Sequence, residues 1–190
     1  MPVPPFRPAF QRLAEASPPW AVALVVISVA LLAWSAQISL PVQPVPVTLQ
    51  SYVLLTLAAL LGWRLGALVI TAYIALGLAG LPVFANGARG FSVLTGASAG
   101  FLAGFVVVAL GVGGLQQYWA RLRPLPLFGV LALGHLVLMV MGAGWIATRS
   151  GYVVAFEKAF LPFVPGAVVK SIAALATVVL VERFAGTPRR

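Results

Sequence analysis

Four long stretches of this chain contain no charged residue, and they limit its possible folds more than any other feature. They cover residues 16–63, 65–88, 90–120 and 124–148. A helix that crosses the hydrocarbon core of a bilayer needs about 20 apolar residues, so these stretches are long enough for several crossings. Only 8% of the residues are charged, whereas a soluble domain carries roughly a quarter. The pattern therefore predicts an all-α, polytopic membrane protein in contact with the lipid bilayer.

Prolines, glycines and polar residues divide these stretches into six predicted transmembrane helices in one bundle. Pro41, Pro44 and Pro46 exclude a regular helix between the first two spans. Arg64, between two glycines, indicates a tight turn. We expect the spans at about 20–36, 48–63, 65–79, 91–118, 127–147 and 165–182. The whole chain, 1–190, is predicted to be a single membrane domain, with tails at 1–15 and 185–190 and the bundle at 16–184.

The distribution of basic residues predicts how the bundle is oriented. With six spans, both chain ends lie on one face of the membrane. That face would hold eight of the 12 basic residues, namely Arg7, Arg12, Arg64, Arg121, Arg123, Arg183, Arg189 and Arg190. Cytoplasmic segments are enriched in Lys and Arg, so we expect both termini to lie in the cytoplasm. We expect the protein in the cell membrane, that is, the plasma or inner membrane. The basic residues are scattered between apolar runs rather than clustered, which argues against nucleic-acid binding.

Several classes of reactive site are excluded by composition. The chain has no Cys, a single His and three acidic residues. Thiolate and multi-histidine metal sites are therefore impossible. Only Glu157 among the acidic residues lies far from a terminus, which disfavours acid/base chemistry by a pair of carboxylates. We expect no enzyme activity, no catalytic residues, no metal and no cofactor.

Lys170 gives the strongest indication of a binding site. It lies about one turn inside the last predicted helix, near the outer boundary of the membrane. An ionisable group inside a span costs several kcal/mol unless it is paired or hydrated. Glu157 is the only plausible acidic partner in the chain. The alternatives are a lysine that reaches the lipid headgroups and a lysine that binds an anionic ligand, and we favour the ligand.

Other polar residues collect at the same outer face. Arg89 could bind a carboxylate through two hydrogen bonds, or lie among headgroups. Thr48, Gln50 and Asn86 can donate and accept hydrogen bonds, which suits an amide-like or ureido ligand, although Thr48 could equally cap a helix. Tyr73 lies near the middle of its helix, where its hydroxyl needs a partner, so we expect it in a pocket.

Two other functional classes remain as hypotheses. The segment Gly96-Ala97-Ser98-Ala99-Gly100 matches the G-x-S-x-G nucleophile pattern, and with His135 it would suit an intramembrane serine hydrolase. However, Gly96, Gly100 and Gly104 recur every four residues, which is typical of close packing between membrane helices. We favour packing, and interpret His135 as a hydrogen-bonded interior residue. A purely structural bundle is the third hypothesis.

Three segments together resemble a known family. They are Pro44-Val45-Pro46-Val47-Thr48-Leu49-Gln50, then Leu76-Gly77-Leu78-Ala79-Gly80-Leu81-Pro82-Val83-Phe84-Ala85, and Pro162-Phe163-Val164-Pro165-Gly166 with Lys170. From about residue 37 to 182 the chain resembles the biotin-specific substrate-binding (S) component of energy-coupling-factor (ECF) transporters. The resemblance implies six helices, high-affinity biotin binding at the outer face, and uptake driven by a coupling protein with two ATP-binding subunits.

The resemblance also implies roles for individual residues. Gln50, Asn86, Arg89 and Lys170 fall in the segments that shape the biotin site of the family. We expect Lys170 and Arg89 to hold the carboxylate, and Gln50 and Asn86 to contact the ring. The family usually has Asp at the position of Ala167. A related carboxylate such as lipoate needs no acceptor there, so it remains an alternative substrate.

Overall fold

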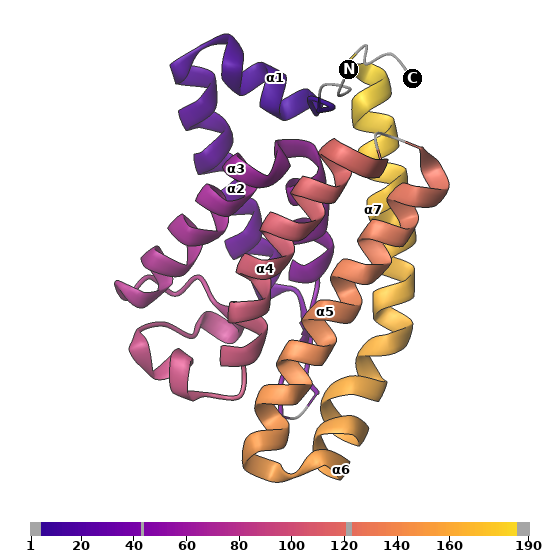
Figure 1. Cartoon of the computed structure of the whole chain (residues 1–190). Helices are drawn as coiled ribbons and strands as arrows, with labels where there is room; N and C mark the ends of the chain where they lie inside the picture. Colours follow the sequence, from indigo (N-terminus) through magenta and orange to yellow (C-terminus); the bar gives the residue numbers. More distant parts are fainter. Residues whose placement is uncertain (1–4, 43, 121–122, 186–190) are drawn as a thin grey trace.

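The computed structural model describes residues 5–42, 44–120 and 123–185, and within them the protein is almost entirely helical (Figure 1). The longer helices are α1 (Ala9–Ala16), α2 (Pro18–Gln37), α3 (Gln50–Leu78), α4 (Ala99–Leu115), α5 (Pro124–Ser150) and α7 (Val164–Phe184). The shorter ones are α6 (Tyr152–Ala155), the 3₁₀-helices η1 (Ala85–Gly87), η2 (Phe91–Thr95) and η5 (Leu161–Phe163), and the π-helical turns η3 (Gln116–Ala120) and η4 (Phe156–Phe160). Strands β1 (Ser39–Leu40) and β2 (Val47–Thr48) form one short antiparallel pair.

The predicted fold class, an all-α membrane protein, is confirmed. Among the described residues, the number of spans is five if α3 is counted as one helix and six if it is counted as two. In the described part of the chain, five helices are long and apolar enough to cross a membrane. One of them, α3, holds two of the predicted spans, because Gly62 (φ 73°, ψ 175°) breaks the helix in a conformation that is essentially restricted to glycine. Gln50 and Tyr73, on the two arms, are hydrogen-bonded to each other. The arms therefore run antiparallel as a helical hairpin, which gives six spans.

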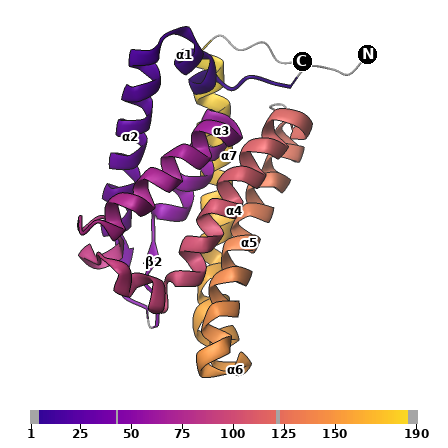
Figure 2. The same cartoon turned by 60° about the vertical axis from the view of Figure 1, so that its left-hand side comes forward.

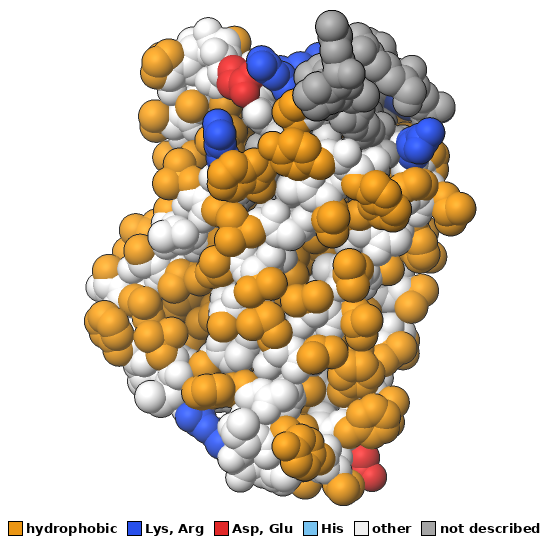
Figure 3. All heavy atoms as spheres, viewed as in Figure 1, with side chains coloured by type: hydrophobic (Ala, Val, Ile, Leu, Met, Phe, Trp, Pro, Cys, Tyr) orange, Lys and Arg blue, Asp and Glu red, His pale blue; other side chains and the backbone are white. Residues whose placement is uncertain are grey.

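Hydrophobic side chains cover the middle of the bundle, as expected for a surface that faces lipid. On the face shown in Figure 3, Lys and Arg side chains lie toward the two ends and hydrophobic side chains lie between them. Large apolar residues of the bundle helices, such as Val26, Leu133 and Ile172, are exposed in the protein alone. In water this surface would be unfavourable, and a bilayer removes that cost.

The N-terminal segment differs from the solvated tail expected over residues 1–15. Residues 9–16 form α1, which lies across the end of the bundle where α7 ends (Figures 1 and 2). The backbone N–H of Ala9 donates to Oε1 of the buried Glu182 (2.8 Å), and Arg12 forms an ion pair with the same carboxylate (3.8 Å). Phe6 and Phe10 pack against the core. These long-range contacts fold the segment, and sequence periodicity cannot reveal them.

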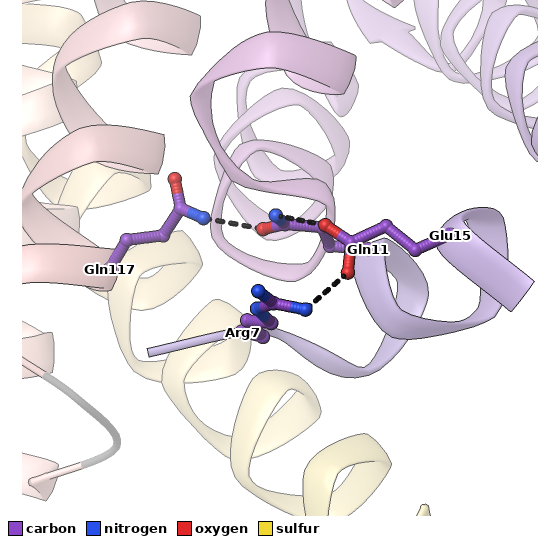
Figure 4. Close-up of polar contacts among 4 residues, drawn as sticks. All are labelled: Arg7, Gln11, Glu15 and Gln117. Atoms are coloured by element: carbon purple, nitrogen blue, oxygen red, sulfur yellow. Dashed lines mark hydrogen bonds and ion pairs between the residues drawn. The ribbon is translucent and has the colours of Figure 1, made fainter. Parts of the chain in front are cut away.

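A polar network also connects α1 to η3, the π-helical turn that follows α4 (Figure 4). Glu15 accepts hydrogen bonds from Arg7 (3.1 Å) and from the amide of Gln11 (2.8 Å), and Gln117 donates to Gln11.

The expected tail over 185–190 lies outside the described residues, apart from Ala185.

The fourth predicted span begins later than expected. Residues 91–95 form η2, and α4 starts only at Ala99. Thr95 donates its hydroxyl hydrogen to the carbonyl of Ser92, and such local side-chain bonds compete with an α-helix.

Small residues bring α4 against α5: a Cβ on Gly100 would lie 2.5 Å from the carbonyl oxygen of Met141. The packing interpretation is therefore confirmed for Gly100 and Gly104, whereas Gly96 lies in the turn before α4 and a Cβ there would meet only the carbonyls of Ser92 and Val93.

Candidate functional site

A cavity of about 90 Å³ lies at the end of the bundle opposite α1. Figure 2 shows the elements that surround this end: β2, the segment between α3 and α4, and the lower parts of α5 and α7. Residues from these elements line it, namely Val45, Pro46, Thr48, Gln50, Ser51, Tyr73, Phe84, Ala85, Ala88, Val93, Ser98, Phe101, Leu102, Phe105, His135, Leu138, Met139, Phe163, Ala167 and Lys170. Most of these side chains are apolar, and a few polar groups converge among them. That combination is typical of a small-molecule binding site.

Aromatic rings form much of the wall. Tyr73 and Phe84 meet edge to face, with ring centroids 5.4 Å apart. Phe101 and Phe163 stack, with centroids 5.5 Å apart. Phe84 can approach α3 closely because Gly77 has no side chain in its way. These rings offer flat apolar surfaces to a ligand with a compact ring system.

Lys170 brings a positive charge into this apolar cavity. The first turns of α7 place it there half-buried, and its Nζ donates to the carbonyl oxygen of Thr48 (2.6 Å) and to Oγ of Ser51 (3.3 Å). Among the described residues, no carboxylate lies within ion-pair distance of Lys170, and the Glu157 side chain is exposed in η4. The ammonium group has neutral partners only, so an anionic group would complement it.

Gln50 and Tyr73 form a buried hydrogen-bonded chain beside Lys170. The Gln50 amide donates to the Tyr73 hydroxyl (2.6 Å), which in turn donates to the carbonyl of Val83 (2.9 Å). Thr48 supports the same region, because its hydroxyl oxygen accepts a hydrogen bond from the backbone N–H of Gln50 (3.3 Å) at the start of α3. The structure therefore gives Thr48 a role at the helix terminus, while its carbonyl holds Lys170.

Replacing Tyr73 by Phe should destabilise this region. The change leaves the Gln50 amide and the Val83 carbonyl without their present partner in a site where Tyr73 is fully buried. We expect the free energy of unfolding to fall by about 1–3 kcal/mol. Thermal unfolding of the purified protein in detergent, followed by tryptophan fluorescence, measures the change. Tyr118→Phe is the control because Tyr118 is exposed; equal stability of both variants would contradict the expectation.

Asn86 and Arg89 do not line the cavity, although their neighbours Ala85 and Ala88 do. Both side chains are exposed. Asn86 adopts a left-handed conformation (φ 57°), which asparagine tolerates in turns, and accepts a hydrogen bond from Ser39 (3.3 Å). In this arrangement Asn86 shapes the loop. The predicted contacts of both residues with a ligand stay predictions.

His135, for which the sequence favoured a hydrogen-bonded position in the interior, also lines the cavity. Its Nδ1 is hydrogen-bonded to Oγ of Ser171 on α7 (2.9 Å), which confirms the interior interpretation. The ring is therefore bonded to Ser171 rather than to Ser98, so the Ser-His pair that the hydrolase hypothesis requires is not formed. Within residues 5–42, 44–120 and 123–185, no three His, Asp or Glu side chains form a group that could hold a metal ion.

Comparisons with known proteins agree on one family. The family model described as the BioY family matches residues 11–187. The biotin transporter BioY2 of Lactococcus lactis subsp. cremoris is 32% identical over 156 residues, which cover 80% of this chain and 85% of that protein. The probable biotin transporter BioY of Pyrococcus horikoshii is 34% identical over 165 residues, covering 87% and 96%.

A solved structure shares the fold. It is the crystal structure of the S-component for biotin from an ECF-type ABC transporter, with a TM-score of 0.72 and 23% sequence identity. The match covers 86% of this chain and 90% of that one. At this identity the likeness establishes the arrangement of the helices.

Proposed function

The chain belongs to the BioY family, and we propose that it binds biotin and takes part in its uptake as the S component of an ECF-type transporter. Both relatives are named as biotin transporters, which supports biotin as the substrate. The fold shared with a solved S-component supports the S-component role. The observation that carries the proposal is the Lys170 ammonium in an apolar cavity, where no described carboxylate balances it. Biotin combines the features that this cavity complements: a carboxylate, an apolar chain and a compact bicyclic ring.

The residues suggest how each part of biotin is held. Lys170 binds the carboxylate, and its bonds to Thr48 and Ser51 fix the ammonium group before the ligand arrives. Preorganisation of this kind lowers the entropic cost of binding. The aromatic walls around Phe84 and Phe101 pack against the ring system. Arg89, on the loop beside the cavity, would add a second cation if that loop moved inward.

Uptake against a concentration gradient needs an energy source. The sequence contains no G-x-x-x-x-G-K-[S/T] phosphate-binding loop. We propose that a coupling protein and ATP-binding subunits supply the energy. The basic end of the bundle around α1 would face them in the cytoplasm, and the cavity would open at the outer face of the cell membrane.

Biotin should bind the purified protein and stabilise it. At a free biotin concentration one hundred times the Kd, binding contributes about 2.7 kcal/mol to the free energy of unfolding. Isothermal titration calorimetry in detergent gives the affinity and stoichiometry, and mass spectrometry of the purified protein identifies any small molecule carried along. Lipoate, which shares the carboxylate and apolar chain, is the comparison ligand. A monodisperse, folded protein that gives neither heat nor a stability increase with biotin would contradict the proposal.

A further inference from the structure

His135 has a polar atom for which the described structure provides no partner. It is the only histidine of the chain, lies on α5 with 4% of its surface exposed, and lines the cavity. Its Nδ1 contacts Ser171, but the buried Nε2 has no hydrogen-bond partner among the described residues. Buried polar groups are normally hydrogen-bonded, so an orphan atom in the wall of a binding cavity points to a ligand contact.

The neighbouring hydrogen bonds determine what Nε2 can do. Ser171 has one hydroxyl hydrogen, which it donates to the carbonyl oxygen of Ala167 (2.8 Å). With that hydrogen on Ala167, the serine oxygen accepts and Nδ1 donates in the bond of 2.9 Å between Ser171 and His135. A neutral imidazole with its hydrogen on Nδ1 has a lone pair on Nε2. Nε2 is then a hydrogen-bond acceptor.

The surroundings favour the neutral ring. The Lys170 ammonium lines the same cavity, and no described carboxylate forms an ion pair with it. A second positive charge in this buried, mostly apolar space would be unfavourable. The cavity thus contains a cation, Lys170, and a lone-pair acceptor, His135. The amide nitrogen of Gln50 and the hydroxyl of Tyr73 are already bonded to each other.

We propose that His135 Nε2 accepts a hydrogen bond from an N–H group of the ligand and selects ligands that carry such a group together with a carboxylate. The assignment rests on the proposed function, and in biotin the donor is a ureido N–H. Lipoate has a carboxylate but no N–H, so it would leave Nε2 without a partner. Sites built around a buried hydrogen bond discriminate strongly against analogues that lack the matching group.

Binding measurements on His135→Phe test the selection. Phenylalanine keeps an aromatic ring but removes the acceptor, so we expect the biotin affinity to fall about 10- to 100-fold. The affinity for lipoate, measured by competition at high concentration, should stay unchanged. The ratio of biotin affinity to lipoate affinity should therefore fall by the same factor, about 10- to 100-fold. Leu136→Phe is the matched control, because it places the same residue at an adjacent, exposed position of α5. It should bind both ligands as the wild type does.

The imidazole can also be observed directly in the unaltered protein. With one histidine in the chain, ¹⁵N-histidine labelling gives a single pair of ring signals, provided that no histidine tag remains. We expect Nδ1 to carry the hydrogen and Nε2 to show the signal of an unprotonated nitrogen. Saturation with biotin should shift the Nε2 signal toward that of a hydrogen-bonded nitrogen, whereas lipoate should leave it in place.

The outcomes separate this inference from the proposed function. If folded wild-type protein does not bind biotin, the proposed function fails. If wild type binds biotin but His135→Phe binds it equally well, or the Nε2 signal does not respond to biotin, only the assignment of His135 is overturned. If His135→Phe does not fold, the labelled wild-type protein still decides the question.

Discussion

Lys170→Met should lower the affinity for biotin by about a hundredfold or more while the protein stays folded. Removing one partner of a buried, hydrogen-bonded charge pair costs about 2–5 kcal/mol, because the other charge is left without compensation. Here that other charge is the ligand carboxylate, which would enter a cavity with mostly apolar walls. Methionine retains most of the length and the apolar character of the lysine stem. Calorimetric titration of both proteins with biotin measures the loss.

The structure also limits what this substitution does to the fold. Lys170 loses two hydrogen bonds, to Thr48 and Ser51, but no described carboxylate is left unpaired. The thermal stability without biotin should therefore change little, since a half-buried charge is also removed. Lys158→Met is the control, because Lys158 is exposed in η4 at the same end of the bundle.

Biotinamide identifies the group that Lys170 contacts. It lacks the negative charge, so it should bind wild type more weakly than biotin does, and Lys170→Met should remove most of that difference. An equal difference in both proteins would show that Lys170 does not bind the carboxylate. A Lys170→Met protein that binds biotin like wild type would refute the assignment altogether.

The spans could be predicted because a bilayer imposes simple constraints on sequence. Length, apolar composition and breakers such as Pro46 and Gly62 place the helices well, and even the turn beside Arg64 follows from its flanking glycines. The prediction failed where contacts between distant residues decide the structure. The folding of α1 depends on Glu182, which is 173 positions away from Ala9. No local pattern contains that information.

The residues of the candidate site also fall into those that sequence can predict and those that depend on contacts between distant residues. Thr48, Gln50, Tyr73 and Lys170 could be predicted because polar residues in or near apolar spans need partners, and all four line the cavity. Their contact with biotin is still a prediction. His135 could be placed in the interior but not in the site, because its environment depends on how α5 packs against α7. For Asn86 and Arg89, sequence identifies the loop but not the direction of their side chains.

Gly113→Leu should prevent the protein from reaching its normal fold. A Cβ at this position would lie 2.5 Å from the backbone nitrogen of Trp63 and 2.7 Å from the carbonyl carbon of Gly62. Both are backbone atoms of the turn in the α3 hairpin, so neither can move aside by a rotamer change. Overpacking a core costs about 1–3 kcal/mol and occasionally more, and a clash with backbone belongs to the severe cases. Yield of monodisperse protein and its thermal unfolding in detergent measure the effect.

The same substitution tests whether the hairpin positions the cavity. Gln50 and Tyr73 lie on the two arms of α3, away from the Gly62 turn, and their bond depends on the alignment of those arms. Any Gly113→Leu protein that can be purified should therefore bind biotin more weakly, although residue 113 does not line the cavity. Gly111→Leu is the control in the same helix, because a Cβ there meets no atom within 4 Å. Equal stability and equal biotin affinity of these two variants would show that close packing of α4 against the turn does not hold the two arms in place.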